Sequence, residues 1–339
     1  MRSGITAGGN WIIDIIKFID GYPHEGNLSN ILRTEEPTNG GCPYNVLLDI
    51  AKLGADLPLQ AVGALGDDEH ADLILEDCRQ HGICTSLLSK RKGQSTSYTD
   101  VFTVMSGGQR TFFHARGANA TLDVDDFKID EIRGAICLVG YLLLLDRLDM
   151  ADKKFGTRAA RLLSMLKDSG IETAVDVVSE NSERFTGIVV PSLKYTDYLI
   201  FNEVEAGKVL GKPLRKRDGS IKFKDASEAS ERLLRMGVGK MVVIHFPEGA
   251  VATVREKGKI IGESVKSLKL PHGFIKGTVG AGDAFCAGCL FGISEGRPLA
   301  EILKLATGVA AASLSDPTAS KGIKSIAQVN ELIDKHQWN

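Results

Sequence analysis

The feature that most constrains the fold is a regular alternation of two apolar patterns along the chain. Short, nearly continuous apolar runs of strand length occur at residues 60–62, 135–139, 173–177, 198–201 and 241–244. Amphipathic stretches with helical spacing alternate with them, at residues 44–53, 69–81, 159–168, 226–236, 284–294 and 299–314. Several of these stretches end at a glycine, where a helix stop is expected. The alternation predicts βαβ units, and therefore an α/β fold with a mostly parallel sheet covered by helices on both faces.

Two segments interrupt this rhythm, at about residues 15–39 and 95–118. Both are rich in turns and in alternating apolar and polar residues. The second contains the glycine turn Gly107-Gly108 between two alternating stretches, which is typical of a hairpin. Because neither segment can form a core of its own, we expect them to cover a site as a lid. We therefore expect a single α/β domain over residues 1–339, with these two segments inserted into it.

Composition excludes several classes of function. The chain is 43% hydrophobic and 25% charged, with a formal net charge of −2, which is typical of an ordinary globular protein. The absence of a basic excess argues against nucleic acid and membranes as partners. The six cysteines form neither a disulfide framework nor a zinc motif, and the N-terminus lacks a signal-peptide core, so we expect a cytoplasmic protein. Glycine is the one residue type in excess: it accounts for 37 of the 339 residues, against a usual share of about 7%.

The strongest local motif is the glycine-rich turn Gly280-Ala281-Gly282-Asp283, which leads into an amphipathic helix. Bare backbone N–H groups at a helix N-terminus favour an anion such as a transferring phosphoryl group. Asp283 could accept the proton of a substrate hydroxyl as that hydroxyl attacks phosphorus. Taken alone, however, the segment fits slightly better a tight turn in which Asp283 only caps the helix.

Two further motifs place polar groups where helices begin. Gly40-Gly41 precedes the helix at 44–53 and brings bare backbone and the amide of Asn45 to a place where a polyol can lie. The segment from Asn202 to Glu205 follows the strand at 198–201, at the carboxyl end where open α/β sheets bind ligands. Glu205 could hold water or Mg²⁺ near a phosphate, or it could simply complement the helix dipole.

Together with Asp14, residues 62–68 and residues 116–120, these motifs resemble the PfkB (ribokinase-like) family of ATP-dependent sugar and nucleoside kinases. The resemblance covers nearly the whole chain. It implies a ribokinase-like three-layer α/β/α fold with a small β lid, whose strands in relatives often pair across a homodimer. It also implies in-line transfer of the γ-phosphate of Mg-ATP to a hydroxyl of a small sugar.

The resemblance further implies roles for individual residues. Asp283 matches the catalytic base, and the anion hole over the γ-phosphate matches Gly280, Ala281 and Gly282. The positions implied to contact the substrate are Asp14, Gly41, Asn45, Arg116 and Asn119. The positions implied to contact the nucleotide are Asn202, Glu205, Thr278, Gly249 and His245, and Glu205 would also hold Mg²⁺ through water.

Two positions depart from the family pattern. Gly277 stands where relatives commonly carry an Asp that helps bind a monovalent cation, so activation by K⁺ is not expected here. Ile244-His245-Phe246 stands where relatives often have Thr-Leu-Gly, and a side chain at Phe246 prevents the close backbone approach that glycine allows. We therefore expect a reshaped nucleotide pocket. His245 is either a phosphate or base contact or an ordinary, partly exposed loop histidine.

Substrate identity is the least constrained part of the prediction. The stretch from Gly40 to Val46 is more similar to the fructokinase-type pattern than to that of ribokinases, and Arg116 fits the same group. Fructose or a similar ketose or keto-acid sugar is therefore our first expectation, with an adenosine-type nucleoside kinase as the alternative. A non-catalytic regulator that binds a sugar or nucleotide would explain the two departures, but the intact turn from Gly280 to Asp283 disfavours it.

Overall fold

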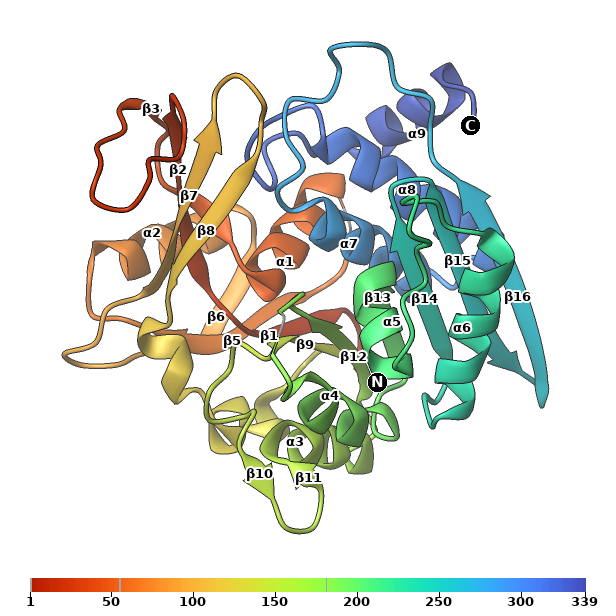
Figure 1. The fold of residues 1–339 in the computed structure, drawn as a ribbon. Helices are drawn as coiled ribbons and strands as arrows, with labels where there is room; N and C mark the ends of the chain where they lie inside the picture. The colour runs from red at the N-terminus through yellow and green to blue at the C-terminus, as the bar shows by residue number, and fades with distance from the viewer. Residues whose placement is uncertain (1, 55, 181) are drawn as a thin grey trace.

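The computed structural model describes residues 2–54, 56–180 and 182–339. Within these residues the centre is a nine-stranded sheet in the order β16-β15-β14-β13-β12-β9-β1-β5-β6 (Figure 1). The strands from β14 to β6 run parallel, and β15 and β16 extend the sheet as an antiparallel edge. The bounds are β1 (Ile5–Gly9), β5 (Leu59–Leu65), β6 (Ile83–Lys90), β9 (Ile136–Leu142), β12 (Glu172–Val177), β13 (Tyr198–Asn202), β14 (Met241–Phe246), β15 (Gly249–Glu256) and β16 (Lys259–Lys266).

Helices cover both faces of this sheet. One layer contains α1 (Cys42–Leu53), α2 (Glu69–Gln80), α7 (Ala281–Ser294), α8 (Leu299–Ser313) and α9 (Ile326–Lys335). The other contains α3 (Arg158–Asp168), α4 (Phe185–Leu193), α5 (Glu203–Leu210) and α6 (Phe223–Arg235). Because neighbouring residues of a strand point to opposite faces, Leu138 packs in the first layer's core and Val139 in the second's. The predicted three-layer α/β/α architecture is therefore confirmed.

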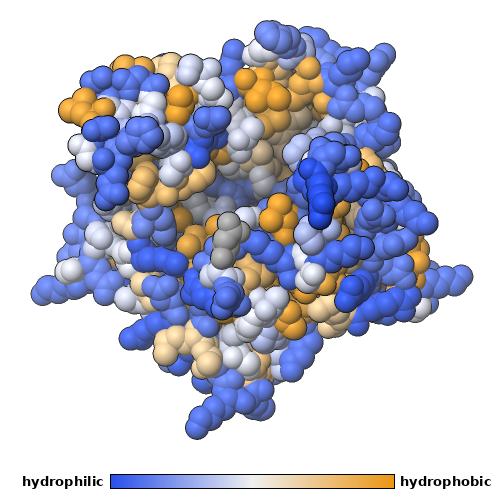
Figure 2. Space-filling view, viewed as in Figure 1, coloured by the Kyte–Doolittle hydropathy of each residue, from blue (hydrophilic) through white to orange (hydrophobic). Residues whose placement is uncertain are grey.

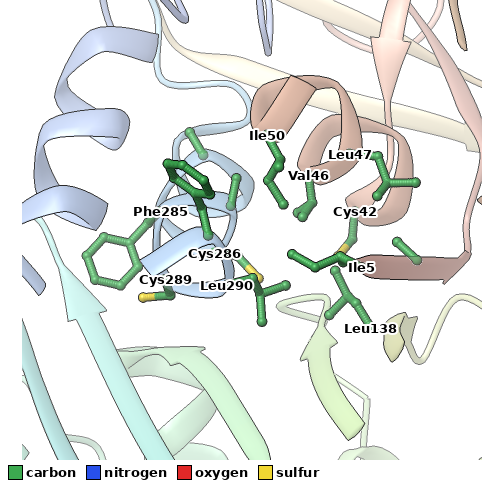
Figure 3. Close-up of a cluster of buried hydrophobic side chains, with 14 of the residues drawn as sticks. Ile5, Cys42, Val46, Leu47, Ile50, Leu138, Phe285, Cys286, Cys289 and Leu290 are labelled. Carbon is green, nitrogen blue, oxygen red and sulfur yellow. The ribbon is translucent and has the colours of Figure 1, made fainter. Parts of the chain in front are cut away.

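The helices α1 and α7 share one core above the sheet. Figure 3 shows Val46 and Ile50 of α1 close to Cys286 and Leu290 of α7, with Leu138 of β9 below them. Cys286 and Cys289 are free and buried in this core, as expected of packing residues. The shared core holds the two helices side by side and brings their N-terminal ends together.

The two segments that interrupt the α/β pattern form a second, small sheet. Its strand order is β3-β2-β7-β8, with β4 paired to β2. The bounds are β2 (Ile12–Ile19), β3 (Ile31–Thr34), β4 (Thr38–Gly40), β7 (Ser97–Val104) and β8 (Arg110–Ala115). This sheet, the predicted lid, rises beside α1 and α7 in Figure 1, and Figure 2 shows a hollow in the molecular surface beneath it.

The predicted helices are all present, with bounds shifted by at most three residues. The sequence analysis did not predict α4, α9 or the antiparallel pair of β15 and β16. Among the described residues, no helix combines the length and the apolar character needed to cross a bilayer.

Candidate active site

Asp283 lies in the first turn of α7, directly after the glycine-rich turn. Gly280 is the N-cap, with a φ of 71°, and no side chain caps the helix. A Cβ at Gly280 would lie 2.7 Å from the Cβ of Ala319, so the turn both needs and tolerates only glycine there. The N–H of Ala281 donates to the Thr278 carbonyl across a long 3.4 Å, and no side chain takes the N–H groups that follow, so the helix start can accept an external anion. The interpretation of Asp283 as a mere cap is wrong, because its carboxylate points into the interior and is only 4% exposed.

Two side chains from distant elements hold the Asp283 carboxylate. The Tyr141 hydroxyl, from β9, lies 2.6 Å from Oδ1 and 2.7 Å from Oδ2, and the Asn45 amide, from α1, donates to Oδ2 at 2.7 Å. Burial raises the pKa of Asp283, while the hydrogen bonds from Asn45 and Tyr141 oppose that rise. The carboxylate is therefore fixed in orientation and remains a usable proton acceptor.

The amide of Asn45 is itself fixed by its neighbours. Its Oδ1 accepts a hydrogen bond of 2.6 Å from Asn39, whose amide also donates to Ser320 at 2.8 Å. Gly41 is the N-cap of α1, with a φ of 84°, and a Cβ there would lie 2.2 Å from the backbone oxygen of Asn10. The glycine pair thus allows the chain to pass against Asn10 while Asn45 turns toward Asp283.

Asp14, on β2 of the lid, lies on the same side of the site. Its carboxylate packs against Gly40, where a Cβ would lie 2.4 Å from Oδ1. Burial, helped by the negative charge of Asp283, raises the pKa of Asp14 to about 7 despite a hydrogen bond from Thr99. Asp14, Asn45 and Asp283, which the resemblance implied to be substrate contacts and base, thus lie close together.

The two remaining predicted substrate contacts have other partners. The Asn119 amide accepts from the backbone N–H of Trp11 at 3.3 Å and donates to its carbonyl at 3.1 Å, so Asn119 holds the chain rather than facing the site. Arg116 donates to the carbonyl of Leu143 at 3.2 Å and pairs with Asp146 at 3.3 Å. Arg116 remains one-third exposed and therefore accessible to a ligand.

Asn202 and Glu205 form a capping box at the start of α5. Asn202 accepts from the N–H groups of Val204 and Glu205, and Glu205 accepts from the Asn202 backbone at 2.9 Å and from the Ser179 hydroxyl at 2.7 Å. Burial raises the pKa of Glu205 to about 7. Glu205 can therefore both complement the dipole of α5 and face Mg²⁺, because its carboxylate caps the helix and is also a buried acid.

Asp176 and Cys42 were missed by the sequence analysis. Their side chains and that of Asp283 bring ligand atoms within 4.8 Å of one another, and all three residues are buried. Burial, followed by the charges of Glu205 and Asp283, raises the pKa of Asp176 well above its ordinary value. Asp176 is the one charged residue inside the apolar run at 173–177, and a lone charge at the end of a buried strand could have identified it.

The acids near α5 and α7 fit a divalent cation. Oxygen donors are the ligands that Mg²⁺ prefers, and burial raises the pKa of both Asp176 and Glu205, with the charge of Glu205 raising that of Asp176 further; a cation would offset this cost of ionisation. Cys42 is not a ligand for Mg²⁺. Asp176 and Glu205 are therefore the residues that would hold the ion, directly or through water.

His245 lies on β14 and not in a loop. Its ring stacks on Phe285 with the ring centroids 4.9 Å apart, and its Cε1 lies 3.5 Å from where a Cβ on Gly282 would be. Burial lowers the pKa of His245 to about 4, so the ring is neutral beside the anion hole. Phe246 instead points away and packs on Phe223, at 5.0 Å between centroids.

Gly249 and Thr278 occupy different surroundings. Gly249 pairs with Phe246 across the β14–β15 turn, and a Cβ there would lie 2.1 Å from the carbonyl oxygen of Val265. Gly249 therefore has a structural reason to be glycine. Thr278 is exposed and lies two residues before the N-cap of α7, where its hydroxyl faces Arg110 of the lid at 3.4 Å.

Asp14→Asn tests the electrostatics of the site in the ligand-free protein. A folded-state pKa of about 7, above that of the unfolded chain, means that the folded protein binds the proton more tightly, so stability falls as pH rises toward 7. The amide carries no such penalty. We expect the variant to be more stable than the parent at pH 8, by up to about 4 kcal/mol, and to differ much less at pH 4.

Urea unfolding at the two pH values measures this difference, with the exposed Asp125→Asn as the matched control. A parent and an Asp14→Asn variant with the same pH dependence would contradict the placement of an unneutralised carboxyl at this position.

Comparisons with known proteins identify the family and the fold. The sequence model described as "pfkB family carbohydrate kinase" matches residues 5–325. The 5-dehydro-2-deoxygluconokinase of Clostridium perfringens is 24% identical over 307 residues, which cover 88% of this chain and 84% of the relative. The structure of Arabidopsis thaliana ribokinase complexed with ribose and ATP superposes with a TM-score of 0.76 at 22% identity, covering 98% of this chain and 99% of the other.

A nucleoside kinase of Burkholderia thailandensis, solved in complex with inosine, has a TM-score of 0.74 at 17% identity and covers 98% of both chains. The fold is thus ribokinase-like, with the small sheet as its lid. The family match extends across nearly all of the sequence. The chain therefore belongs to the pfkB family of carbohydrate kinases, phosphotransferases that act on an alcohol group of a sugar.

Proposed function

We propose that this kinase transfers the γ-phosphate of Mg-ATP to a hydroxyl of a ketose or a keto-acid sugar. The observation that carries the proposal is the buried Asp283 carboxylate, oriented by Tyr141 and Asn45 beside the uncapped N-terminus of α7. The curated relative named 5-dehydro-2-deoxygluconokinase supports a keto-sugar acid as the substrate class. Fructose fits the same site chemistry and is part of the proposal.

In the proposed reaction the attacking sugar hydroxyl lies between Asp283 and the γ-phosphorus. As the new O–P bond forms and the bond from phosphorus to the ADP oxygen breaks, the hydroxyl proton moves to the Asp283 carboxylate. The backbone N–H groups at the start of α7, including those of Ala281 and Gly282, donate hydrogen bonds to the phosphoryl oxygens and stabilise their developing negative charge. Mg²⁺, held by Asp176 and Glu205, would neutralise charge on the phosphates.

The remaining residues position the reactants. Asp14 and the backbone of Gly41 offer acceptors and donors for sugar hydroxyls next to the base, and Arg116 offers a cation farther along the same end. His245, neutral and beside Gly282, can donate one hydrogen bond to a phosphate without adding charge. The lid excludes water, which would otherwise compete with the sugar for the phosphoryl group.

Asp283→Asn tests the assignment of the base. Removing a general base is expected to lower kcat by about 10² to 10⁴, because the hydroxyl proton loses its acceptor, while the sugar and ATP still bind. ADP release measures kcat, and calorimetric titration measures binding. The exposed Asp125→Asn should behave as the parent in both.

The parent enzyme is first assayed with Mg-ATP on a panel of ketoses, aldoses, keto-acid sugars and nucleosides. The greatest turnover on a ketose or keto-acid sugar is the expected result, and greatest turnover on a nucleoside would replace the proposal with the adenosine-type alternative. ADP release that no compound stimulates would overturn the proposed function. A parent-like rate in Asp283→Asn would remove that residue from its role.

Tyr141→Phe tests how the base is tuned. The phenol donates to both carboxylate oxygens, so its loss removes stabilisation of the ionised form and raises the pKa of Asp283. Activity requires the ionised base, and it is lost as pH falls through that pKa. We therefore expect the acidic limb of the kcat/KM profile to shift to higher pH, by about one unit or more for a hydrogen bond to a charged group. An unshifted limb would show that Tyr141 does not act through Asp283.

We also propose that the lid pairs with the lid of a second copy. Phe113 on β8 is 58% exposed, and β3 is exposed along its whole length, with Ile31 at 54%. Apolar side chains gathered on a small sheet of this kind are typical of an interaction surface. Light scattering at micromolar concentration should give the mass of two chains for the parent and of one chain for the double variant Ile31→Lys/Phe113→Lys. A monomeric parent would contradict this proposal.

A further inference from the structure

Arg110 of the lid reaches the turn that precedes the anion hole. It is the first residue of β8, and its Nη1 lies 3.4 Å from the Thr278 hydroxyl. A Cβ at Gly277 would lie 2.7 Å from Nη2 of the same guanidinium. A cationic side chain of the lid therefore already touches the segment that leads into Gly280 and α7.

The register of the lid explains why Arg110 points inward. Arg110 is paired with Thr103 of β7, and Thr99, on the same strand, is paired with Asp14 of β2. Residues two or four apart on a strand share a face, and directly paired residues point to the same side of a sheet. Arg110 therefore lies on the same face of the lid as Asp14, the carboxylate that lines the sugar end of the site.

The guanidinium of Arg110 lacks an anionic partner. Within the described part of the chain no carboxylate forms an ion pair with it, although it is only partly exposed. Burial lowers its pKa, with no neighbouring negative charge to offset the effect. A partly desolvated guanidinium without a carboxylate is costly, and this cost is removed when an anion binds next to it.

Gly277 makes room for this contact. A side chain at position 277 would meet the guanidinium. It would also meet the backbone of the loop after α8, because a Cβ would lie 2.6 Å from Cα of Pro317. Where the family pattern commonly carries an acid, this chain therefore has no side chain at all, and the space beside the turn is taken by a fixed positive charge.

We propose that Arg110 binds the γ-phosphate of the nucleotide at the mouth of the anion hole and stabilises its charge during transfer. The inference rests on the proposed function for the identity of the anion. Arg110 stays protonated throughout and exchanges no proton; it contributes charge and the two guanidinium donors that lie beside Thr278 and Gly277. Because the guanidinium comes from the lid, closing the lid over the sugar also completes the phosphate site.

Nucleotide binding tests the contact without catalysis. Mg-AMP-PNP, which has a γ-phosphate, and Mg-ADP, which has none, are titrated calorimetrically into the parent, Arg110→Gln and Arg33→Gln. Arg33 is the matched control, since it is a lid arginine already paired with Glu35. We expect Arg110→Gln to weaken AMP-PNP binding about 10-fold to 100-fold, the range for a hydrogen bond to a charged group, and to leave ADP binding unchanged.

Equal losses for both nucleotides in Arg110→Gln, or a loss for neither, would overturn the proposal. Because the arginine reaches Thr278 by a contact within the chain itself, the titrations do not depend on finding a sugar substrate. If the substrate panel fails while Arg110→Gln still discriminates AMP-PNP from ADP, the proposed function is wrong and the phosphate contact stands.

Turnover supplies an independent readout. With the sugar identified, we expect Arg110→Ala to lower kcat about 10²-fold with little change in the KM of the sugar, as for loss of one donor to a developing oxyanion. Free guanidinium ion at millimolar concentration should restore part of that rate in Arg110→Ala and not in Asp283→Asn. A defect that guanidinium does not rescue, with a parent-like response to AMP-PNP, would assign Arg110 a purely structural role.

Discussion

The rest of the structure depends on one buried carboxylate. Burial disfavours the ionised form of Asp283. The hydrogen bonds that Tyr141 and Asn45 donate to its carboxylate partly offset this cost. Those two donors belong to β9 and α1, and the carboxylate belongs to α7. The packing of α1 against α7 over Leu138 is therefore the geometric condition for the carboxylate's orientation, on which the proposed role as base depends (Figure 3).

The same region concentrates negative charge that the ligand-free protein does not neutralise. Asp14, Asp176, Glu205 and Asp283 all have raised pKa values, chiefly because they are buried, and several raise one another's. Such an arrangement lowers stability and is retained where it serves function. A divalent cation near Asp176 and Glu205 would convert mutual repulsion into attraction. In the proposed reaction the anionic phosphates would lie at the positive end of α7, apart from these acids.

The sequence predicted the elements and motifs whose chemistry is local. The turn from Gly280 to Asp283, the pair Gly40-Gly41 and the N-cap Asn202 can each be recognised because backbone geometry demands those residue types at those places. Tyr141 could not be found in this way, since it continues an apolar strand and only the folded chain turns its hydroxyl to Asp283. Likewise, the short α4 contains Pro191, which obscures a helical pattern, and its partners in packing are distant in sequence.

Contacts between the lid and the body could not be predicted either, because they join residues that are distant in sequence. Arg110 and Thr278 are 168 residues apart, and nothing in either segment indicates the other. Their meeting is a consequence of strand register, which places Arg110 and Asp14 on one face of one small sheet. A kinase must bind its sugar before it exposes the phosphate to attack, or water will take the phosphoryl group. If Asp14 binds the sugar and Arg110 the phosphate, as proposed, their position on a single face of one sheet links the two requirements mechanically, because neither group can reach the site without the other.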